Sequence, residues 1–327
     1  VCGLVINKFR GDSALFADGV RFLRERTGIP VLGVLPFLRD LTLDQEDSLD
    51  VEIRRQAAFA DDRVNIAVLL LPHMSNFTDF NMLTQEADVA LRYVATPAEA
   101  AGADAVIIPG SKSTLTDLTY LRGKGFDAVV QDHVRGGGEL VGICGGYQML
   151  GNRIADPDGV ETGGEADGLG LLQTYTIMMP EKITEQVEAS ALHLDDAGSV
   201  SVRGYLIHMG RTDPGPHRSC FHLEGRPARS VDQLQAGAPD AGSSDGAVRD
   251  DGLVWGTYIH GLFDQSPFRR AWLNRLRRRK GLPPIELVRS QQVNDTQRHA
   301  LDRWADHVEQ HLDLTPIWAI LRSQTGG

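Results

Sequence analysis

The stretch Glu139-Leu-Val-Gly-Ile-Cys144-Gly-Gly-Tyr-Gln148-Met-Leu150 decides the fold that the rest of the chain has to build. An apolar run leads into a cysteine flanked by glycines, and the residues after the glycines have the composition of a helix start. Glycines on both sides of one side chain permit a tight strand-to-helix turn that exposes a nucleophile. Unpaired amides and the helix dipole favour a thiolate there. The stretch predicts a catalytic cysteine, Cys144; the alternative is a structural thiol beside a glycine turn.

Alternating strands and helices surround this cysteine. Apolar runs that predict strands occupy 65–71, 91–94 and 105–108, and helices are expected near 81–86, 116–121 and 126–135. This alternation predicts an α/β fold with a doubly wound and mostly parallel sheet. Ligands of such sheets bind at the carboxyl ends of the strands.

Residues 1–62 are expected to be the C-terminal part of another α/β domain. Strands at 3–6 and 31–35 flank a helix over 15–27, then an acidic loop at 41–50 and a helix at 51–60. The sequence has no Gly-x-x-x-x-Gly-Lys-[Ser/Thr] pattern and so no P-loop of its own. Because the chain begins inside a predicted strand, we expect it to be a fragment of a longer polypeptide.

The region after residue 168 has a different character. Strands are predicted at 168–173, 173–179 and 200–208, a surface loop at 235–252, and a buried strand within 252–264 that ends at a histidine. The predicted domains are therefore 1–62, 63–267 and a helical segment 268–327, whose last helix is near 296–312. The basic run at 269–280 is interpreted as a solvated helix face, or as a patch for a polycarboxylate substrate or a partner domain.

Composition excludes several classes of function. The net charge of −11 opposes general binding to nucleic acid, and no apolar run approaches the roughly 20 residues that span a membrane. Three cysteines, Cys2, Cys144 and Cys220, fit a reducing cytoplasm better than a disulfide framework. No Cys and His cluster has zinc-ligand spacing, so no metal site is predicted.

Acyl transfer by Cys144 needs a base and an oxyanion site. His260 closes an apolar strand and precedes a glycine, which favours it as the base, and His208 is the rival candidate. By the geometry of the turn, the amide of Gly145 is one oxyanion donor. Gly110 or Ser111, after the strand at 105–108, could supply a second, although Pro109-Gly110-Ser111 could also be an ordinary turn.

Four separated motifs carry a resemblance to a known family. They are Ile6-Asn-Lys-Phe-Arg-Gly-Asp12, Leu71-Pro-His-Met-Ser-Asn-Phe-Thr-Asp-Phe80, Ile108-Pro-Gly-Ser-Lys-Ser-Thr114 and Tyr258-Ile-His-Gly-Leu-Phe-Asp264. Gly142-Ile-Cys-Gly-Gly-Tyr-Gln148 resembles the nucleophile motif of class I glutamine amidotransferases. Together these motifs resemble the cobyric acid synthase family of cobalamin biosynthesis, over nearly the whole chain.

The resemblance implies ATP-dependent amidation of peripheral carboxylates of adenosylcobyrinic acid a,c-diamide, with L-glutamine as ammonia donor. It implies Cys144 as nucleophile, His260 as general base, and Gly110, Ser111 and Gly145 as oxyanion hole. Gln148 and the segment from Tyr205 to His208 would line the glutamine pocket. Asn7 resembles the asparagine that contacts adenine at the end of a strand in nucleotide-binding domains of this kind. ATP and Mg²⁺ are expected for the complete enzyme, whereas this fragment would bind no cofactor and would hydrolyse glutamine at most.

Two positions depart from the wider amidotransferase pattern. Leu262 stands where many class I members have the Glu that orients the histidine, and Leu206 stands where a Glu is expected. Two alternatives stay open: the glutaminase subunit of a peptidoglycan-precursor amidating complex, and a catalytically decayed binding module on the same fold.

Overall fold

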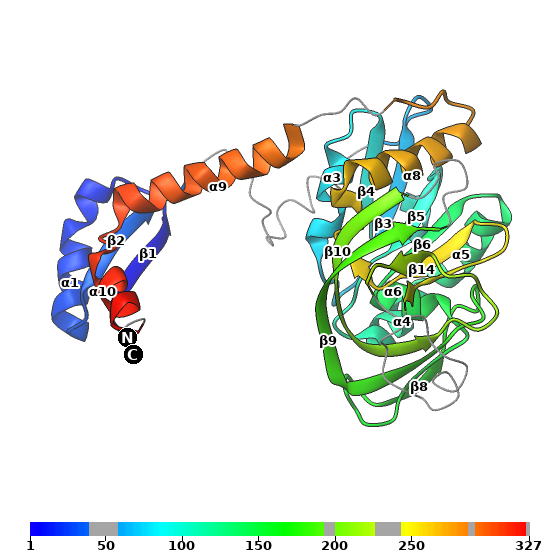
Figure 1. Ribbon diagram of the computed structural model, residues 1–327, viewed down its shortest axis with the longest axis horizontal. Coiled ribbons are helices and arrows are strands. Elements are labelled where there is room, and N and C mark those ends of the chain that lie inside the picture. The colour runs from blue at the N-terminus through cyan, green and yellow to red at the C-terminus, as the bar shows by residue number, and fades with distance from the viewer. Residues whose placement is uncertain (39–57, 193–199, 226–242, 287–291, 325–327) are drawn as a thin grey trace. The chain divides into compact units, whose positions relative to one another are not determined.

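The chain divides into two compact units, each described here by itself. The computed structural model describes residues 1–38, 58–192, 200–225, 243–286 and 292–324 (Figure 1). Unit 1 combines Val1–Asp44 with Val288–Gly327, and unit 2 is Gln45–Leu287. These units are drawn differently from the predicted segments 1–62, 63–267 and 268–327, whose limits stay predictions.

A six-stranded sheet forms the centre of unit 2, with helices packed against it (Figure 1). The strand order is β13-β14-β6-β5-β3-β4, and only β13 is antiparallel. The strands are β3 (Val64–Leu69), β4 (Val89–Val94), β5 (Ala105–Ile108), β6 (Glu139–Ile143), β13 (Ala247–Val248) and β14 (Val254–Thr257). Every residue of β3, β5 and β6 is buried, as a parallel sheet covered on both faces requires. The predicted doubly wound α/β fold is confirmed.

The helical elements of unit 2 are short. They are η2 (Phe77–Phe80), α3 (Asn81–Thr84), η3 (Pro97–Ala100), α4 (Thr114–Gly123), α5 (Phe126–Arg135), α6 (Gly145–Leu150), η4 (Leu262–Asp264) and α8 (Ser266–Arg279). The predicted helix at 126–135 has the limits of α5, whereas α4 extends two residues beyond the prediction at each end.

A second, mostly antiparallel sheet adjoins the first. Its long strands β9 (Tyr175–Ala191) and β10 (Val200–Asp213) extend beyond the predicted 173–179 and 200–208. Its other strands are β7 (Arg153–Asp156), β8 (Gly164–Asp167), β11 (Phe221–Leu223), β12 (Ser244–Asp245) and β15 (Ile259–His260). The predicted strand at 168–173 is wrong. The amides of Gly168 and Leu169 bond to Asn152 and Met149 around the end of α6, and no strand partner lies beside them.

The single buried strand predicted within 252–264 is also wrong, because two strands occupy it. β14 belongs to the parallel sheet, and β15 pairs with β10 in the other sheet. Between them, the amide of Tyr258 donates to the buried carboxylate of Asp245, and the amide of Ile259 donates to the Thr257 hydroxyl over 3.0 Å. Asp245 lies in β12, so the predicted loop is wrong there; residues 235–242 lie outside the described residues.

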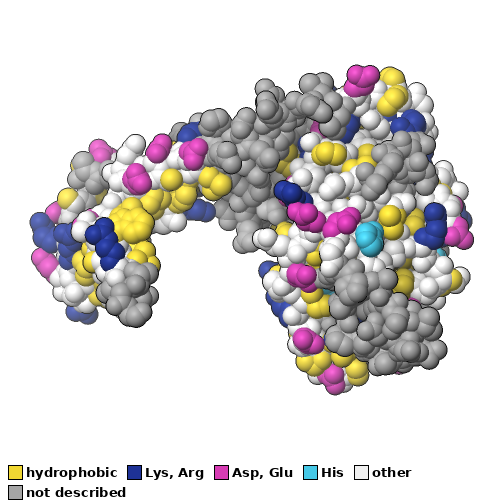
Figure 2. Space-filling model, in the orientation of Figure 1, with side chains coloured by type: hydrophobic (Ala, Val, Ile, Leu, Met, Phe, Trp, Pro, Cys, Tyr) yellow, Lys and Arg dark blue, Asp and Glu magenta, His cyan; other side chains and the backbone are white. Residues whose placement is uncertain are grey.

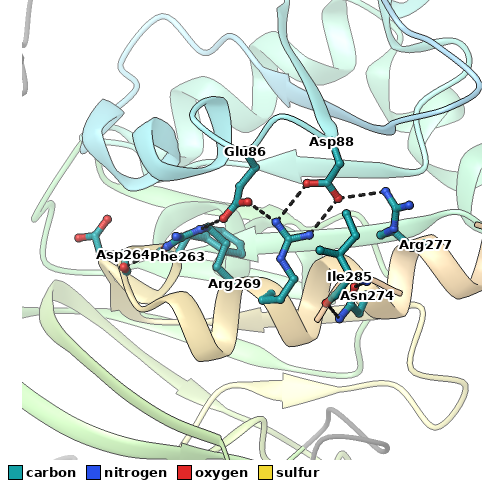
Figure 3. A network of polar contacts seen from close by, with 9 residues as sticks. Glu86, Asp88, Phe263, Asp264, Arg269, Asn274, Arg277 and Ile285 are labelled. Atoms are coloured by element: carbon teal, nitrogen blue, oxygen red, sulfur yellow. Dashed lines mark hydrogen bonds and ion pairs between the residues drawn. The ribbon is translucent and has the colours of Figure 1, made fainter. Parts of the chain in front are cut away.

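The basic run is not a solvated helix face. Arg269, Arg270, Arg275 and Arg277 of α8 are buried. Arg270 pairs with both Glu86 and Asp88, and Arg269 Nε lies 2.7 Å from Glu86. Figure 3 shows Glu86 and Asp88 beside Arg269 and Arg277 of α8. Arg277 lies 3.0 Å from Asp88. The prediction failed because these acidic partners lie about 180 positions away in the sequence, beyond the reach of local composition.

A second anchor of α8 is the fully buried carboxylate of Glu139, at the start of β6. The indole N–H groups of Trp255 and Trp272 donate to its Oε1, each over 2.7 Å. Arg275 donates to the same oxygen, and Arg279 donates to Oε2 over 2.6 Å. Four donors therefore compensate one desolvated anion.

Unit 1 contains a two-stranded parallel sheet, β1 (Leu4–Phe9) and β2 (Val31–Pro36). Its helices are η1 (Ser13–Phe16), α1 (Ala17–Thr27), α9 (Gln292–His311) and α10 (Thr315–Gln324). The chain after α9 joins β2, since the amide of Asp313 donates to the Leu32 carbonyl over 2.8 Å. Figure 2 shows hydrophobic side chains gathered along α9 and by α10. The predicted loop at 41–50 and most of the helix at 51–60 lie outside the described residues.

Replacing Glu139 with Ala is expected to destabilise unit 2 by about 3–5 kcal/mol, because two indole N–H groups and a buried arginine lose their acceptor. Urea unfolding followed by tryptophan fluorescence measures this free energy. Asp132→Ala is the matched control. It breaks the exposed Asp132–Arg135 pair and should cost less than about 1 kcal/mol. Equal losses for the two variants would contradict the importance of the Glu139 anchor.

Candidate active site

Cys144 lies in a strained turn between β6 and α6. Its backbone has φ 51° and ψ −109°, a conformation that side chains other than glycine rarely adopt. Its amide donates to Thr257 of β14 over 2.8 Å, which fixes the turn to the sheet. A Cβ on Gly146 would lie 1.9 Å from the Ile108 carbonyl oxygen, so α6 crosses β5 too closely for any other residue. The glycine-flanked turn predicted from the sequence is present.

His260 is fully buried beside Cys144 and is held by a carboxylate. Its Nδ1 lies 2.7 Å from Asp79 Oδ2, and the amide of Gly261 donates to Asp79 Oδ1 over 2.9 Å. The neighbouring Cys144 side chain also contributes to the pKa of His260, and its Sγ lies 3.7 Å from the Ile207 carbonyl oxygen. The Asn76 amide nitrogen lies 2.9 Å from both ring nitrogens. Cys144, His260 and Asp79 therefore have the arrangement that a nucleophile, a base and an orienting acid require.

The charge of His260 is set by these neighbours. Burial disfavours the imidazolium and lowers the pKa of His260, but the hydrogen bonds with Asp79 and Cys144 raise it more. The result is a pKa of about 10, so His260 is protonated at neutral pH. An imidazolium at this position can donate a proton to a leaving group.

The carboxylate that contacts His260 comes from Asp79 and not from position 262, where many related proteins have a glutamate. Leu262 is fully buried in the core and does not orient the histidine. The orienting acid comes from η2, which follows β3 and lies 181 positions before His260. Asp79 was part of the Leu71–Phe80 motif, but no spacing rule connects an acid so distant in sequence with a histidine. Sequence reasoning therefore missed it.

Two loops build the predicted oxyanion region after β3 and β5. The amide of Ser75 donates to the Gly110 carbonyl, and that of Lys112 to the His73 carbonyl, each over 2.9 Å. The buried Asp117 ties the loops together, since it lies 2.9 Å from His73 Nδ1 and accepts from Ser111 Oγ over 2.6 Å.

The predicted oxyanion residues converge on the cysteine. A Cβ on Gly145 would lie 2.9 Å from the Ser111 amide nitrogen, and one on Gly110 would lie 3.3 Å from His260 Cε1. The structure thus brings Gly110, Ser111 and Gly145 together around Cys144 and His260.

A cavity of about 420 Å³ opens beside Cys144. It is lined by Ser75, Asn76, Ser111, Lys112, Thr114, Cys144, Gly145, Gln148, Val160, Glu161, Met178, Lys182, Ile207, His208 and Met209. Gln148 is fixed on both sides, because Thr114 Oγ1 donates to its Oε1 and its Nε2 donates to the Tyr258 hydroxyl, each over 3.1 Å. His208 stacks on Tyr258 with ring centroids 3.8 Å apart. Both Gln148 and His208 therefore lie where a pocket was predicted.

Other predicted site residues lie elsewhere. Tyr205 stacks on His260 with centroids 5.3 Å apart, and burial raises the pKa of Tyr205 to about 12. Its ring therefore packs against the base and does not line the cavity. Leu206 is buried in the core cluster. Asn7 lies in unit 1, where its side chain accepts the Lys8 amide over 2.8 Å.

Known proteins share this sequence pattern. The model of the CobB/CobQ-like glutamine amidotransferase domain matches residues 65–268. Cobyric acid synthase from Klebsiella pneumoniae (strain 342) is 43% identical over 98% of this chain and 61% of that protein. The Citrobacter koseri protein of that name is 45% identical over 98% of this chain and 62% of its own length. The cobyric acid synthase of Nostoc punctiforme is 41% identical over 96% of this chain and 61% of its own length.

The α/β fold of unit 2 and the matching domain model define a glutamine amidotransferase domain. This chain belongs to the CobB/CobQ-like glutamine amidotransferase family. It spans about three fifths of the length of the curated relatives that it matches.

Removing the carboxylate with Asp79→Asn is expected to lower the pKa of His260 from about 10. A raised native pKa adds stability that is fully present below the unfolded value of about 6.5 and is lost as pH rises through about 10. The stability difference between wild type and Asp79→Asn should therefore shrink as pH rises from 7 to 10. Histidine NMR titration checks the pKa, with His133 as an internal control, because burial lowers its pKa independently of Asp79. An unchanged His260 titration would contradict the role of Asp79.

The backbone strain at Cys144 predicts an unusual pair of variants. Cys144→Gly removes strain of about 1–3 kcal/mol that Cys144→Ala retains, against a glycine entropy cost of about 0.5–1 kcal/mol. Cys144→Gly should therefore have the higher thermal unfolding midpoint. At Ala155 in β7, where the backbone φ is ordinary, Ala→Gly should lower the midpoint. A lower midpoint for Cys144→Gly than for Cys144→Ala would show that the turn is unstrained.

Proposed function

We propose that this chain hydrolyses glutamine through a Cys144 thioester and supplies ammonia for amidation. The observation that supports this most directly is the contact of His260 Nδ1 with Asp79 over 2.7 Å, beside a Cys144 that lines a cavity. The family match to a glutamine amidotransferase domain names the substrate class.

In the first half of the reaction, Cys144 Sγ attacks the side-chain amide carbon of glutamine. The tetrahedral oxyanion accepts hydrogen bonds from the backbone amides of Gly145 and of Ser111 or Gly110. The carbon–nitrogen bond then breaks, and His260 gives its proton to the departing ammonia. Asp79 keeps the imidazolium oriented throughout, because its carboxylate accepts from Nδ1.

In the second half, water attacks the thioester carbon, and His260 acts as the base that removes the water proton. The carbon–sulfur bond breaks, glutamate leaves and releases the second water proton from its new carboxyl group to solvent, and Cys144 and His260 return to their starting state. The same imidazole therefore serves as acid and then as base, which explains why a pKa of about 10 is compatible with catalysis near neutral pH.

For the complete protein, we propose amidation of peripheral carboxylates of a corrinoid, adenosylcobyrinic acid a,c-diamide. The support is the name cobyric acid synthase, carried by relatives 41–45% identical over 96–98% of this chain. ATP and Mg²⁺ would activate the carboxylate. The residues of this chain do not fit that role, since the sequence has no P-loop pattern and the described residues hold no group of three or more His, Cys, Asp or Glu that could bind a metal. We assign no activation step to them.

The two alternatives have less support. A peptidoglycan-precursor glutaminase subunit would be expected to resemble proteins of that name, whereas the relatives above are cobyric acid synthases. A decayed binding module would be expected to have lost these residues, whereas His260 is held 2.7 Å from Asp79 and Cys144 lines the cavity. Among the described helices, none is both long and apolar enough to cross a membrane.

Cys144→Ser is expected to reduce glutamate release from glutamine by at least about 10³-fold, because the nucleophile is lost. In the full-length protein, amidation with ammonium salts as nitrogen donor should persist, because it bypasses the thioester. Cys220→Ser is the matched control. Cys220 is buried and donates to the Gly256 carbonyl over 3.4 Å, so its loss should leave glutamate release unchanged in the folded protein. Loss of both nitrogen sources in Cys144→Ser would instead indicate a structural role for the thiol.

A further inference from the structure

The cavity beside Cys144 contains one carboxylate that the proposed reaction does not use. Glu161 lines the cavity and is half-buried. The Thr114 amide donates to its Oε2 over 2.5 Å, and the Thr114 hydroxyl oxygen, whose single hydrogen Gln148 and Glu161 share, lies 3.1 Å from its Oε1. The Glu161 side chain therefore lies at the first residue of α4, on the wall of the pocket.

A folded loop fixes the Glu161 backbone. The fully buried carboxylate of Asp156, at the end of β7, accepts three backbone amides. Val160 donates to it over 2.7 Å, Glu161 over 2.9 Å and Gly163 over 2.8 Å. The loop therefore wraps around the Asp156 carboxylate and places the Glu161 side chain at the cavity.

Glu161 is close to the reacting end of the pocket. Thr114 Oγ1 lies 3.1 Å from Glu161 Oε1, and it lies 3.2 Å from where a Cβ on Gly145 would be. One hydroxyl thus separates this carboxylate from the residue after the nucleophile. In glutamine, three carbon–carbon bonds separate the amide carbon from the α-carbon, so a bound α-ammonium would also lie near the nucleophile.

The charge of Glu161 is only partly compensated. Burial raises the pKa of Glu161, despite the hydrogen bonds that Thr114 donates. A cation in the cavity would stabilise the ionised form. The cavity also contains two cationic side chains, Lys112 and Lys182, which complement a carboxylate. The pocket wall therefore offers both signs of charge, as an α-amino acid zwitterion requires.

We propose that the Glu161 carboxylate binds the α-ammonium group of glutamine and thereby selects an α-amino acid at this site. This inference rests on the proposed glutaminase function. In this arrangement Glu161 contacts the α-ammonium group and neither the amide carbon nor the leaving ammonia. It therefore determines which substrates bind, not the rate of the chemical step. Its loss should raise KM for glutamine and leave kcat within about threefold.

The test compares two substrates in two variants. L-Glutamine and 4-carbamoylbutanoate share the amide and the carboxylate, but the second lacks the α-ammonium. Wild type should prefer glutamine in kcat/KM. Glu161→Gln should lower kcat/KM for glutamine by about 10- to 100-fold, the range for losing a charged hydrogen-bond partner. The same variant should change kcat/KM for 4-carbamoylbutanoate by less than about threefold.

Two controls separate recognition from folding. Glu161→Gln keeps an acceptor for Thr114, so α4 retains its cap, and Asp158→Asn removes an exposed carboxylate from the same loop. Asp158→Asn should leave both substrates unchanged. Equal losses for both substrates in Glu161→Gln, or an unchanged preference for glutamine, would overturn the proposal.

Failure of the proposed function has a different signature. Calorimetric titration of Cys144→Ala with glutamine should show binding that weakens by the same 10- to 100-fold in the Cys144→Ala, Glu161→Gln double variant. A wild type that neither binds glutamine nor releases glutamate would refute the glutaminase and, with it, this inference. Glutamine turnover with no effect of Glu161→Gln on binding would refute the inference alone.

Discussion

The left-handed backbone of Cys144 is the constraint on which the rest of the site depends. A side chain at φ 51° persists only where surrounding contacts over-determine it. Here β14 holds the Cys144 amide, and the crossing of α6 over β5 leaves no room for a Cβ at Gly146. The buried sheet strands therefore hold Cys144 in a conformation that it would not adopt alone.

Around this turn, the charges of unit 2 are arranged so that each buried ion has partners. Glu139 accepts hydrogen bonds from four side chains, and Asp156 accepts hydrogen bonds from backbone amides. Asp79 accepts a hydrogen bond from the Gly261 amide and pairs with the His260 imidazole. Such groups would be costly if left unpaired. Their shared effect is positional: Glu139 fixes α8 to β6, Asp156 shapes a pocket loop, and Asp79 orients the base.

Local sequence signals were sufficient to predict the parallel sheet, the turn at Cys144 and the position of His260 at the end of a strand. They rest on hydrophobic runs and on glycine, which act within a few residues. The wrong and missed predictions share one cause: each depends on residues that interact across a long distance in the sequence. The arginines of α8 are buried because Glu86, Asp88 and Glu139 compensate their charges. β12 forms because it pairs with β11, whose residues Phe221 and His222 lie more than 20 positions earlier. Asp79 and Glu161 were missed for the same reason, since each acts on a residue of a remote element.

The division of residues 252–264 into β14 and β15 places the two reacting side chains on different sheets. Cys144 belongs to β6 and its turn, whereas His260 belongs to β15, which pairs with β10 of the antiparallel sheet at Tyr205. The distance between the Cys144 sulfur and the His260 imidazole therefore depends on how the two sheets are aligned. A displacement of β10 that carried β15 with it would move His260 relative to Cys144 while the parallel sheet stayed intact.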